Sequence, residues 1–281
     1  MATEIRRSID AAIGDTQGHK AEVHSTKVLI VEQASFKVPF RLYRPTADAK
    51  PPVALLIHDG AFLACSIDNY DHTARALAAG SGVAILSVGY TLSPDASITK
   101  QVAECEAVLD WLRGPGAAQL DLDAARTAVV GDSAGATLAT LPTLRVRDRQ
   151  LPLAFQALIN PVVDATSSLV KSPQTKGFTA AITSLAVDSG QDVGAPENSP
   201  LFAKSHAGLP PALVIVSEQD AWAPEGLVYA ETLRHAGVPV NTYPLFGLDH
   251  LGPDGARATD TAREGLAVAA AAIGATLRAP K

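Results

Sequence analysis

Residues 127–138 read Thr-Ala-Val-Val-Gly-Asp-Ser-Ala-Gly-Ala-Thr-Leu, a short apolar strand followed by GDSAG and by a helix start rich in small residues. This order predicts a sharp strand-to-helix turn with Ser133 at its tip. Such a turn leaves no room for side chains beside the serine, which explains Gly131 and Gly135. The pattern is typical of a nucleophile elbow. The alternative is a glycine-flanked turn with a helix-capping serine, so the prediction depends on partners elsewhere in the chain.

The composition is that of a globular protein with a large buried core. Of the 281 residues, 47% are hydrophobic and 19% are charged, which is far from a disordered composition. The formal net charge of −6 gives no electrostatic reason to expect nucleic acid or an anionic membrane surface as a partner. We therefore expect a small-molecule partner, and the sequence leaves a homodimer open.

Targeting and cofactor signals are missing from the sequence. No apolar segment follows Arg6 and Arg7, so the start does not predict a secretory signal, and the apolar stretch 265–277 is too short to span a bilayer. We therefore expect a cytoplasmic protein whose cysteines, Cys65 and Cys105, stay reduced. No zinc-ligand spacing and no glycine-rich phosphate-binding motif occurs. The sequence predicts neither a metal nor a cofactor.

Strand and helix patterns alternate along most of the chain. Nearly continuous apolar runs predict parallel strands buried on both faces, at 53–58, 83–88, 127–130, 153–159 and 212–216. Helical patterns are found at 71–79, 98–112, 134–145 and 225–235. A strand hairpin at 27–32 and 36–44 precedes them, and a strand at 238–245 and a helix from about 255 to 277 follow. The alternation predicts the α/β class, with a mostly parallel central sheet and helices on both faces.

Two segments do not fit this alternation. Residues 1–24 read as a polar helix and a loop, and residues 164–198 hold only weak helical signal. A long loop within a compact domain usually carries function, such as a lid over an active site. We therefore expect one domain over residues 1–281, with a small cap formed by about 1–24 and 164–198.

His250 is the candidate general base. It follows the last predicted strand within the glycine-flanked stretch 246–252, at a strand end where catalytic groups gather in parallel sheets. His235, by contrast, ends a predicted helix and is explained as a cation at a helix C-terminus. Ser133 and His250 have the chain order of a serine, acid, histidine triad.

The acid of such a triad orients the histidine and stabilises its protonated form, so it should follow a neighbouring strand. Asp220 fits, because the buried strand 212–216 leads into the loop that contains it. Glu218 is the close alternative, and Asp249 is a poor one because adjacent residues rarely place their side chains face to face. The other role open to Asp220 is to cap the helix predicted at 225–235.

An oxyanion hole needs backbone N–H groups aimed at the carbonyl oxygen as it becomes negative. Ala134, directly after the elbow serine, supplies one from the start of a helix. The loop after the first buried strand reads His-Asp-Gly-Ala-Phe over residues 58–62. Its small residues let a substrate approach the backbone, so Gly60 and Ala61 are predicted as the other donors.

Taken together, these motifs resemble the hormone-sensitive-lipase-like branch of the α/β-hydrolase esterases, over about residues 35–255. The stretch HDGA at 58–61 stands where that family has HGGG, and VGYTLSPD at 88–95 resembles the family's VxYRLxPE. GDSAG at 131–135 is identical to the family's GDSAG. DAWAPEG at 220–226 resembles its DPLxDEG, and GLDH at 247–250 stands where the family has GxxH. The resemblance implies an α/β-hydrolase fold with no cofactor. It also implies Ser133, Asp220 and His250 as the triad and Gly60, Ala61 and Ala134 as the oxyanion donors.

The chain departs from the family pattern in two places. Asp59 and Ala61 replace glycines of the oxyanion loop, but backbone donors survive if the loop keeps its conformation, and Asp tolerates unusual φ angles. Asp59 also brings a negative charge near the oxyanion site, which is unfavourable unless the carboxylate turns away or pairs. Thr91 and Asp95 replace an arginine and a glutamate, which removes an ion pair of the local scaffold.

The sequence thus predicts a serine carboxylesterase that hydrolyses small, short-acyl esters through an acyl-enzyme intermediate. An amidase or another acyl hydrolase would use the same triad, and a non-catalytic ligand-binding or receptor-like relative is the alternative from another class. Phe62 and Trp222 are candidates for lining the substrate pocket, since pockets often use aromatic side chains; alternatively they pack against the cap.

Overall fold

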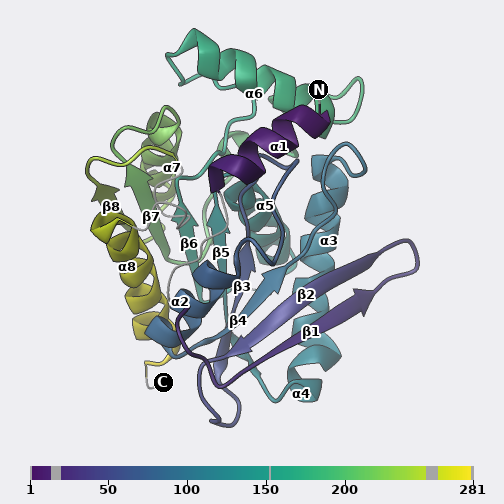
Figure 1. The fold of residues 1–281 in the computed structure, drawn as a ribbon, viewed down its shortest axis with the longest axis vertical. Coiled ribbons are helices and arrows are strands. Elements are labelled where there is room, and N and C mark those ends of the chain that lie inside the picture. The colour runs from purple at the N-terminus through teal and green to yellow at the C-terminus, as the bar shows by residue number, and fades with distance from the viewer. Residues whose placement is uncertain (1, 14–19, 152, 251–258, 280–281) are drawn as a thin grey trace.

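The computed structural model describes residues 2–13, 20–151, 153–250 and 259–279. In these residues an eight-stranded sheet forms the centre, in the order β1-β2-β4-β3-β5-β6-β7-β8 (Figure 1). The strands are β1 (Ser25–Glu32), β2 (Lys37–Arg44), β3 (Pro52–Ile57), β4 (Ala84–Val88), β5 (Asp123–Asp132), β6 (Phe155–Ile159), β7 (Ala212–Ser217) and β8 (Val240–Leu245). β1 pairs with β2 and β2 with β4 in antiparallel fashion, and the other pairs are parallel. The predicted hairpin and mostly parallel sheet are confirmed.

Helices cover both faces of the sheet. They are α1 (Ala2–Ile13), α2 (Asp71–Ser81), α3 (Ile98–Trp111), α4 (Ala117–Gln119), α5 (Ala134–Asp148), α6 (Pro173–Ala186), α7 (Ala223–His235) and α8 (Asp260–Leu277). A π-helical turn, η1 (Leu112–Gly116), joins α3 to α4, and a 3-10 turn, η2 (Pro200–Phe202), precedes β7. One apolar layer packs α3, α5 and α7 on the sheet, and the other packs α2 and α8 on the opposite face.

Strand β3 shows why the central strands read as continuous apolar runs. Its six residues are all buried. Val53, Leu55 and Ile57 belong to the layer under α3 and α5, whereas Ala54 and Leu56 belong to the layer under α2 and α8. Because successive side chains of a strand point to opposite faces, a strand covered on both sides has no position left for a polar residue.

Most predicted boundaries lie within a few residues of the observed ones. β5 extends beyond the predicted 127–130 at both ends, and β8 begins at Val240, not at residue 238. The start predicted for the last helix, near residue 255, falls outside the described residues, which show α8 from Asp260.

Residues 164–198 hold only weak helical signal in the sequence, and in the structure they contain the 14-residue helix α6. Its N-terminus is well defined: the Ser172 hydroxyl accepts a hydrogen bond from the Thr175 N–H at 3.2 Å, and Pro173 occupies the first helical position. Both features favour a helix start. Helices α6 and α1 lie together above the carboxyl ends of the parallel strands, at the top of Figure 1.

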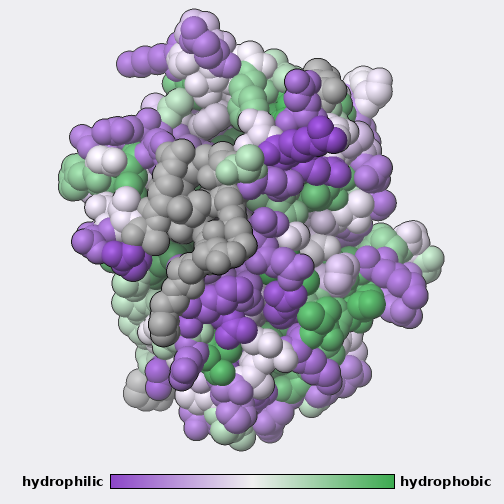
Figure 2. All heavy atoms as spheres, viewed as in Figure 1, coloured by the Kyte–Doolittle hydropathy of each residue, from purple (hydrophilic) through white to green (hydrophobic). Residues whose placement is uncertain are grey.

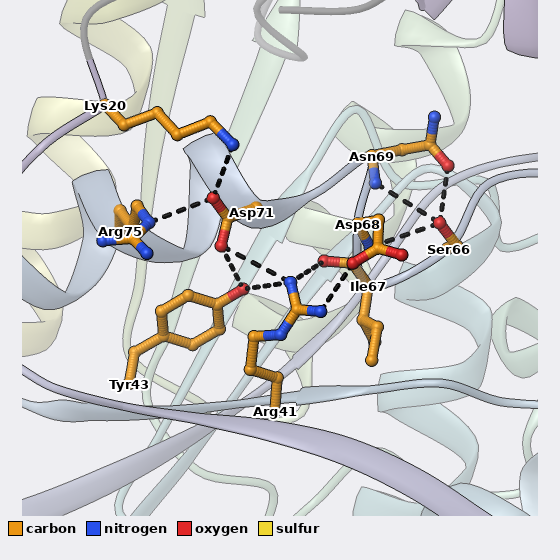
Figure 3. Close-up of polar contacts among 9 residues, drawn as sticks. All are labelled: Lys20, Arg41, Tyr43, Ser66, Ile67, Asp68, Asn69, Asp71 and Arg75. Carbon is orange, nitrogen blue, oxygen red and sulfur yellow. Dashed lines mark hydrogen bonds and ion pairs between the residues drawn. The ribbon is translucent and has the colours of Figure 1, made fainter. Parts of the chain in front are cut away.

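A charged cluster ties the chain that follows α1 to β2 and α2 (Figure 3). The carboxylate of Asp71 pairs with Lys20 at 2.9 Å and with Arg75 at 3.0 Å, and it accepts hydrogen bonds from Tyr43 at 2.9 Å and Arg41 at 3.5 Å. Burial alone would raise the pKa of Asp71. The hydrogen bonds from Lys20, Tyr43 and Arg75 outweigh it and lower this pKa to about 2. Asp71 thus keeps its charge down to strongly acidic pH.

The face of the molecule seen in the space-filling view is largely polar, and it includes an apolar area. Figure 2 shows apolar side chains gathered at the lower right, over the β1–β2 hairpin, where Val28 and Ile30 are each 54% exposed. No helix in the described part of the chain has the length and apolar character needed to cross a membrane.

Candidate active site

Ser133 lies in the sharp turn between β5 and α5 that the sequence predicts. Its backbone is strained, with φ of +52° and ψ of −116°. A Cβ on Gly131 would lie 2.5 Å from the carbonyl oxygen of Gly135, and a Cβ on Gly135 would lie 2.2 Å from that of Ile57. Both glycines are therefore required by close backbone contacts, and the serine hydroxyl is held at the carboxyl edge of the sheet.

The three residues predicted as a triad meet at this edge. The Oγ of Ser133 lies 2.6 Å from Nε2 of His250, and Nδ1 of His250 lies 2.7 Å from Oδ2 of Asp220. The side chain of Asp220 is fully buried, and its other oxygen accepts the Trp222 N–H at 2.8 Å. An Nδ1–H donated to a carboxylate leaves Nε2 with a lone pair that can accept the serine proton.

Glu218, the close alternative to Asp220 in the sequence, is used differently. Its Oε2 accepts the N–H of Gly247 at 3.1 Å, which stabilises the loop before His250. Asp249 lies in the wall of the cavity described below. The geometry therefore places Asp220 against the histidine and gives Glu218 a supporting position.

Asn160 supports the same edge and was missed in the sequence. It follows β6 with a φ of +40°; its Nδ2 donates to the carbonyl oxygen of His250 at 2.9 Å, and its Oδ1 accepts the N–H of Ser217 at 2.8 Å. The available signal was a polar residue directly after a buried strand. Asn160 links the end of β7 to the backbone of the histidine.

The loop after β3, residues 58–65, has an unusual backbone. Positive φ angles occur at Gly60 (+124°), Ala61 (+52°) and Phe62 (+65°). A Cβ on Gly60 would lie 2.0 Å from the carbonyl oxygen of Ala64, so glycine is required there. Asp59 does not turn away from the predicted donors, because its Oδ1 accepts the N–H of Ala61 at 3.2 Å. One of the three predicted oxyanion donors is thus occupied by the chain's own carboxylate.

His58 holds the same loop from inside the core. Its Nδ1 donates to the carbonyl oxygen of Asp59 at 2.6 Å, and its ring stacks on Tyr90, with centroids 4.3 Å apart. The hydroxyl of Tyr90 donates to the carbonyl oxygen of His58 at 3.1 Å. Complete burial lowers the pKa of His58 to about 4, although the hydrogen bond to Asp59 acts in the opposite direction. This histidine is neutral at physiological pH and acts as a structural support.

At Thr91, part of the second departure from the family pattern, local hydrogen bonds hold the backbone. The N–H and the hydroxyl of Thr91 both donate to the carboxylate of Glu104, at 2.6 and 2.8 Å. Glu104 is 1% exposed. A pair of hydrogen bonds to one buried carboxylate therefore holds this segment without the arginine.

Helix α1 is bonded directly to the loop at 58–65. The guanidinium of Arg6 donates to the carbonyl oxygens of Leu63 at 2.6 Å and Ser93 at 3.1 Å. One turn further, Oδ1 of Asp10 accepts the N–H of Cys65 at 3.1 Å. Residues four apart share a face of a helix, so a single face of α1 fastens the loop.

A cavity of about 370 Å³ opens above Ser133. Phe62 and Trp222, the predicted pocket residues, both lie in its wall. The Trp222 ring also lies 4.7 Å from the His250 ring. Residues of α1 and α6 also line the cavity, namely Ser8, Ile9, Phe178, Thr179, Ile182 and Thr183. Its size and its mainly apolar lining with a few polar groups are typical of small-molecule sites.

Comparison with known proteins agrees with this architecture. A family model described as alpha/beta hydrolase fold matches residues 54–252, which is more than half of the chain. The chain belongs to the α/β-hydrolase fold family. This α/β-hydrolase is 29% identical over 257 residues to an arylesterase of Saccharolobus solfataricus, covering 88% of this chain and 83% of the relative. It is 33% identical over 222 residues to the carboxylesterase NlhH of Mycobacterium tuberculosis, covering 72% and 67%.

Solved structures give the same result. The α/β-hydrolase superposes on an esterase of Pyrobaculum calidifontis with a TM-score of 0.89 at 27% identity, covering 98% of this chain and 93% of the other. The predicted membership in the hormone-sensitive-lipase-like branch is confirmed. By this relationship the protein is a carboxylic ester hydrolase, and not the non-catalytic relative that the sequence left open.

Proposed function

We propose that this α/β-hydrolase is a serine carboxylesterase for small, short-acyl esters, with Ser133, His250 and Asp220 as its catalytic triad. The observation that carries the proposal is the pair of short contacts from Ser133 to His250 (2.6 Å) and from His250 to Asp220 (2.7 Å), at the base of an apolar cavity. Nucleophile, base and orienting acid then stand in the relation that acyl transfer needs.

In the first half of the reaction, Nε2 of His250 takes the proton of the Ser133 hydroxyl while Oγ attacks the ester carbonyl carbon. The buried carboxylate of Asp220 stabilises the imidazolium that forms. His250 then gives the proton to the alcohol oxygen as the C–O bond breaks, which leaves an acyl-enzyme on Ser133. In the second half, a water molecule is activated by the same histidine, attacks the acyl carbon and releases the acid.

The negative oxygen of each tetrahedral intermediate is stabilised by backbone N–H groups. Ala134 lies at the first position of α5, where the helix dipole and an unpaired N–H favour a negative charge. Gly60 and Ala61 supply the other donors, and Ala61 does so only by sharing its N–H with Asp59.

The cap and the cavity support the choice of substrate. In the proposed single domain, the cap predicted over about 1–24 and 164–198 contributes α1 and α6, which line the cavity of about 370 Å³ over the serine. This volume lies near the lower end of the range for small-molecule sites, about 300 to 1,000 Å³. Phe62 and Trp222 contact the substrate from the wall. The cytoplasmic location and the homodimer stay predictions.

The test is hydrolysis of 4-nitrophenyl acetate, butyrate and octanoate by the wild type and by Ser133→Ala. We expect acetate and butyrate to be cleaved faster than octanoate, and the variant to lose about 10⁴-fold or more in kcat. Ser35→Ala is the matched control, because Ser35 is an exposed serine in the β1–β2 turn; this variant should keep the wild-type rate.

Two results would contradict the proposal. Cleavage of no ester by the wild type, or equal rates for wild type and Ser133→Ala, would exclude the serine mechanism. Hydrolysis of 4-nitroacetanilide at a kcat/KM equal to that of the acetate ester would show an amidase.

A further inference from the structure

Asp59 is a buried carboxylate beside the reacting atoms that the mechanism above does not use. It is 3% exposed and lies in the wall of the cavity that also contains Ser133, Ala134 and His250. Within the described residues, the only hydrogen bond to its carboxylate is the one that Ala61 donates to Oδ1 at 3.2 Å. Its second oxygen therefore has capacity for a ligand in the cavity.

A carboxylate at the position of Asp59 disfavours the hydrolysis of a neutral ester. An oxyanion at hydrogen-bond distance from the Ala61 N–H lies within about 6 Å of the carboxylate that shares the same donor. Like charges this close in an apolar cavity repel each other strongly. Among the described residues of the cavity wall there is no lysine or arginine to compensate. His250 becomes positively charged in the same step, but its Nδ1 faces the carboxylate of Asp220 at 2.7 Å. A positive charge that pairs with Asp59 is therefore one that the substrate brings.

We propose that Asp59 is a specificity-determining residue that makes the site select esters with a protonated amino group on the carbon next to the carbonyl, such as α-amino esters. The inference rests on the proposed function. In such a substrate the ammonium nitrogen is three bonds from the carbonyl oxygen, so it lies between the oxyanion and the carboxylate. It donates to the oxygen of Asp59 that accepts no hydrogen bond in the described residues, and these charge-assisted bonds are stronger than neutral ones.

A purely structural role for Asp59 is the competing explanation. Its bond to Ala61 stabilises a loop with positive φ angles at Ala61 and Phe62. Asn at this position still offers a side-chain oxygen to the Ala61 N–H but carries no charge. Asp59→Asn therefore removes the charge but keeps the hydrogen bond that supports the loop, whereas Asp59→Gly removes both.

The test compares alanine methyl ester with methyl isobutyrate, which differ only in an ammonium against a methyl group. Measurements at pH 6.5 keep the α-amino group, with an ordinary pKa of about 7.7–8.0, protonated. The ammonium group also makes the ester chemically more reactive, whichever variant is used. The readout is therefore kcat/KM for alanine methyl ester divided by kcat/KM for methyl isobutyrate, compared between variants. We expect this ratio to fall by about tenfold or more in Asp59→Asn and in Asp59→Gly. Hydrolysis of the neutral ester should rise, since the repulsion of its oxyanion is gone.

Asp95→Asn is the matched control, because Asp95 is an exposed carboxylate whose loss changes the net charge equally. In Asp95→Asn, the ratio of the two kcat/KM values should equal that of the wild type. The inference is overturned if Asp59→Asn keeps the wild-type ratio, or if Asp95→Asn lowers the ratio as much. Either result leaves the proposed function intact, whereas failure of the wild type to cleave any ester would remove the proposed function itself.

A measurement on the wild type alone covers the case in which the Asp59 variants do not fold. Alaninamide and isobutyramide are compared as inhibitors of 4-nitrophenyl acetate hydrolysis. We expect alaninamide to inhibit at a concentration about tenfold lower. Equal inhibition by the two amides would overturn the inference.

Discussion

The two sides of the proposed active site are positioned in different ways. On the triad side, Ser133, Asp220 and His250 follow the carboxyl ends of β5, β7 and β8, and the sheet register brings them together. On the oxyanion side, the loop at 58–65 is held by hydrogen bonds from Asp59, His58 and the helix α1.

Formation of the covalent bond therefore depends on the triad side, and stabilisation of the negative oxygen depends on the oxyanion side. Ser133 and Asp220 follow strand ends that are fully buried, so their positions have the stability of the core, whereas His250 follows β8, a largely exposed edge strand. The oxyanion side depends on a surface helix and on side chains that replace the family's glycines. We infer that changes on the triad side abolish activity and that changes on the oxyanion side adjust rate and specificity.

The largest effect is expected from Asp220→Asn, at about 10⁴-fold in kcat, because the amide no longer stabilises the imidazolium. Glu218→Gln keeps an oxygen for the Gly247 N–H and should stay within a few-fold of the wild type. Steady-state hydrolysis of 4-nitrophenyl acetate measures both. A loss as large in Glu218→Gln as in Asp220→Asn would contradict the assignment of the acid.

A smaller effect, about tenfold in kcat, is expected from Arg6→Ala, because the guanidinium bonds to Leu63 and Ser93 hold the loop that carries the proposed oxyanion donors. Arg7→Ala is the control, since Arg7 is an exposed cation on the same helix. Thermal denaturation followed in parallel shows whether the loss is one of stability. If both variants behave alike, α1 does not position the loop through Arg6.

The smallest effect on activity is expected from Glu225→Gln, a variant that tests a buried carboxyl group on the triad side. Glu225 is 0% exposed and accepts the N–H groups of Val163 and Asp164 at 3.1 and 3.2 Å. Burial raises its pKa to about 8, although the two backbone hydrogen bonds lower it. Between the ordinary value of 4.5 and about 8 the folded state holds a proton that the unfolded state has released, so stability falls as pH rises.

The Glu225→Gln variant removes this titration while an amide oxygen still accepts the two N–H groups. We therefore expect the urea midpoint of the wild type to fall more steeply than that of the variant between pH 5 and pH 8. Expressed as the free energy of unfolding, the largest possible difference in slope is about 1.4 kcal/mol per pH unit. Parallel slopes would show that Glu225 is ionised in the folded protein.

The fold was predictable because its signals are local. Runs such as 53–58 are apolar at every position, which in a chain with alternating helices indicates parallel strands covered on both faces. Helix α6 was underestimated because two of its four buried residues are threonines and its Phe178 is exposed, so apolar residue type does not mark its inner face, even though Ser172 and Pro173 mark its start. In the site, the elbow was predicted from the steric demand on Gly131 and Gly135, and the order of Ser133, Asp220 and His250 followed from the chain.

The sequence by itself determined the elements, the turn at Ser133 and the set of candidate acids, because these depend on residue type and spacing. Only the tertiary structure decided that Asp220 faces His250 while Glu218 supports Gly247, and that Asp59 pairs with the Ala61 N–H. It also brought Arg6 and Asp10 of α1 onto the oxyanion loop. The physical reason is range: steric and periodic constraints act between neighbours along the chain, whereas the direction of a carboxylate depends on groups that only folding brings within hydrogen-bond distance.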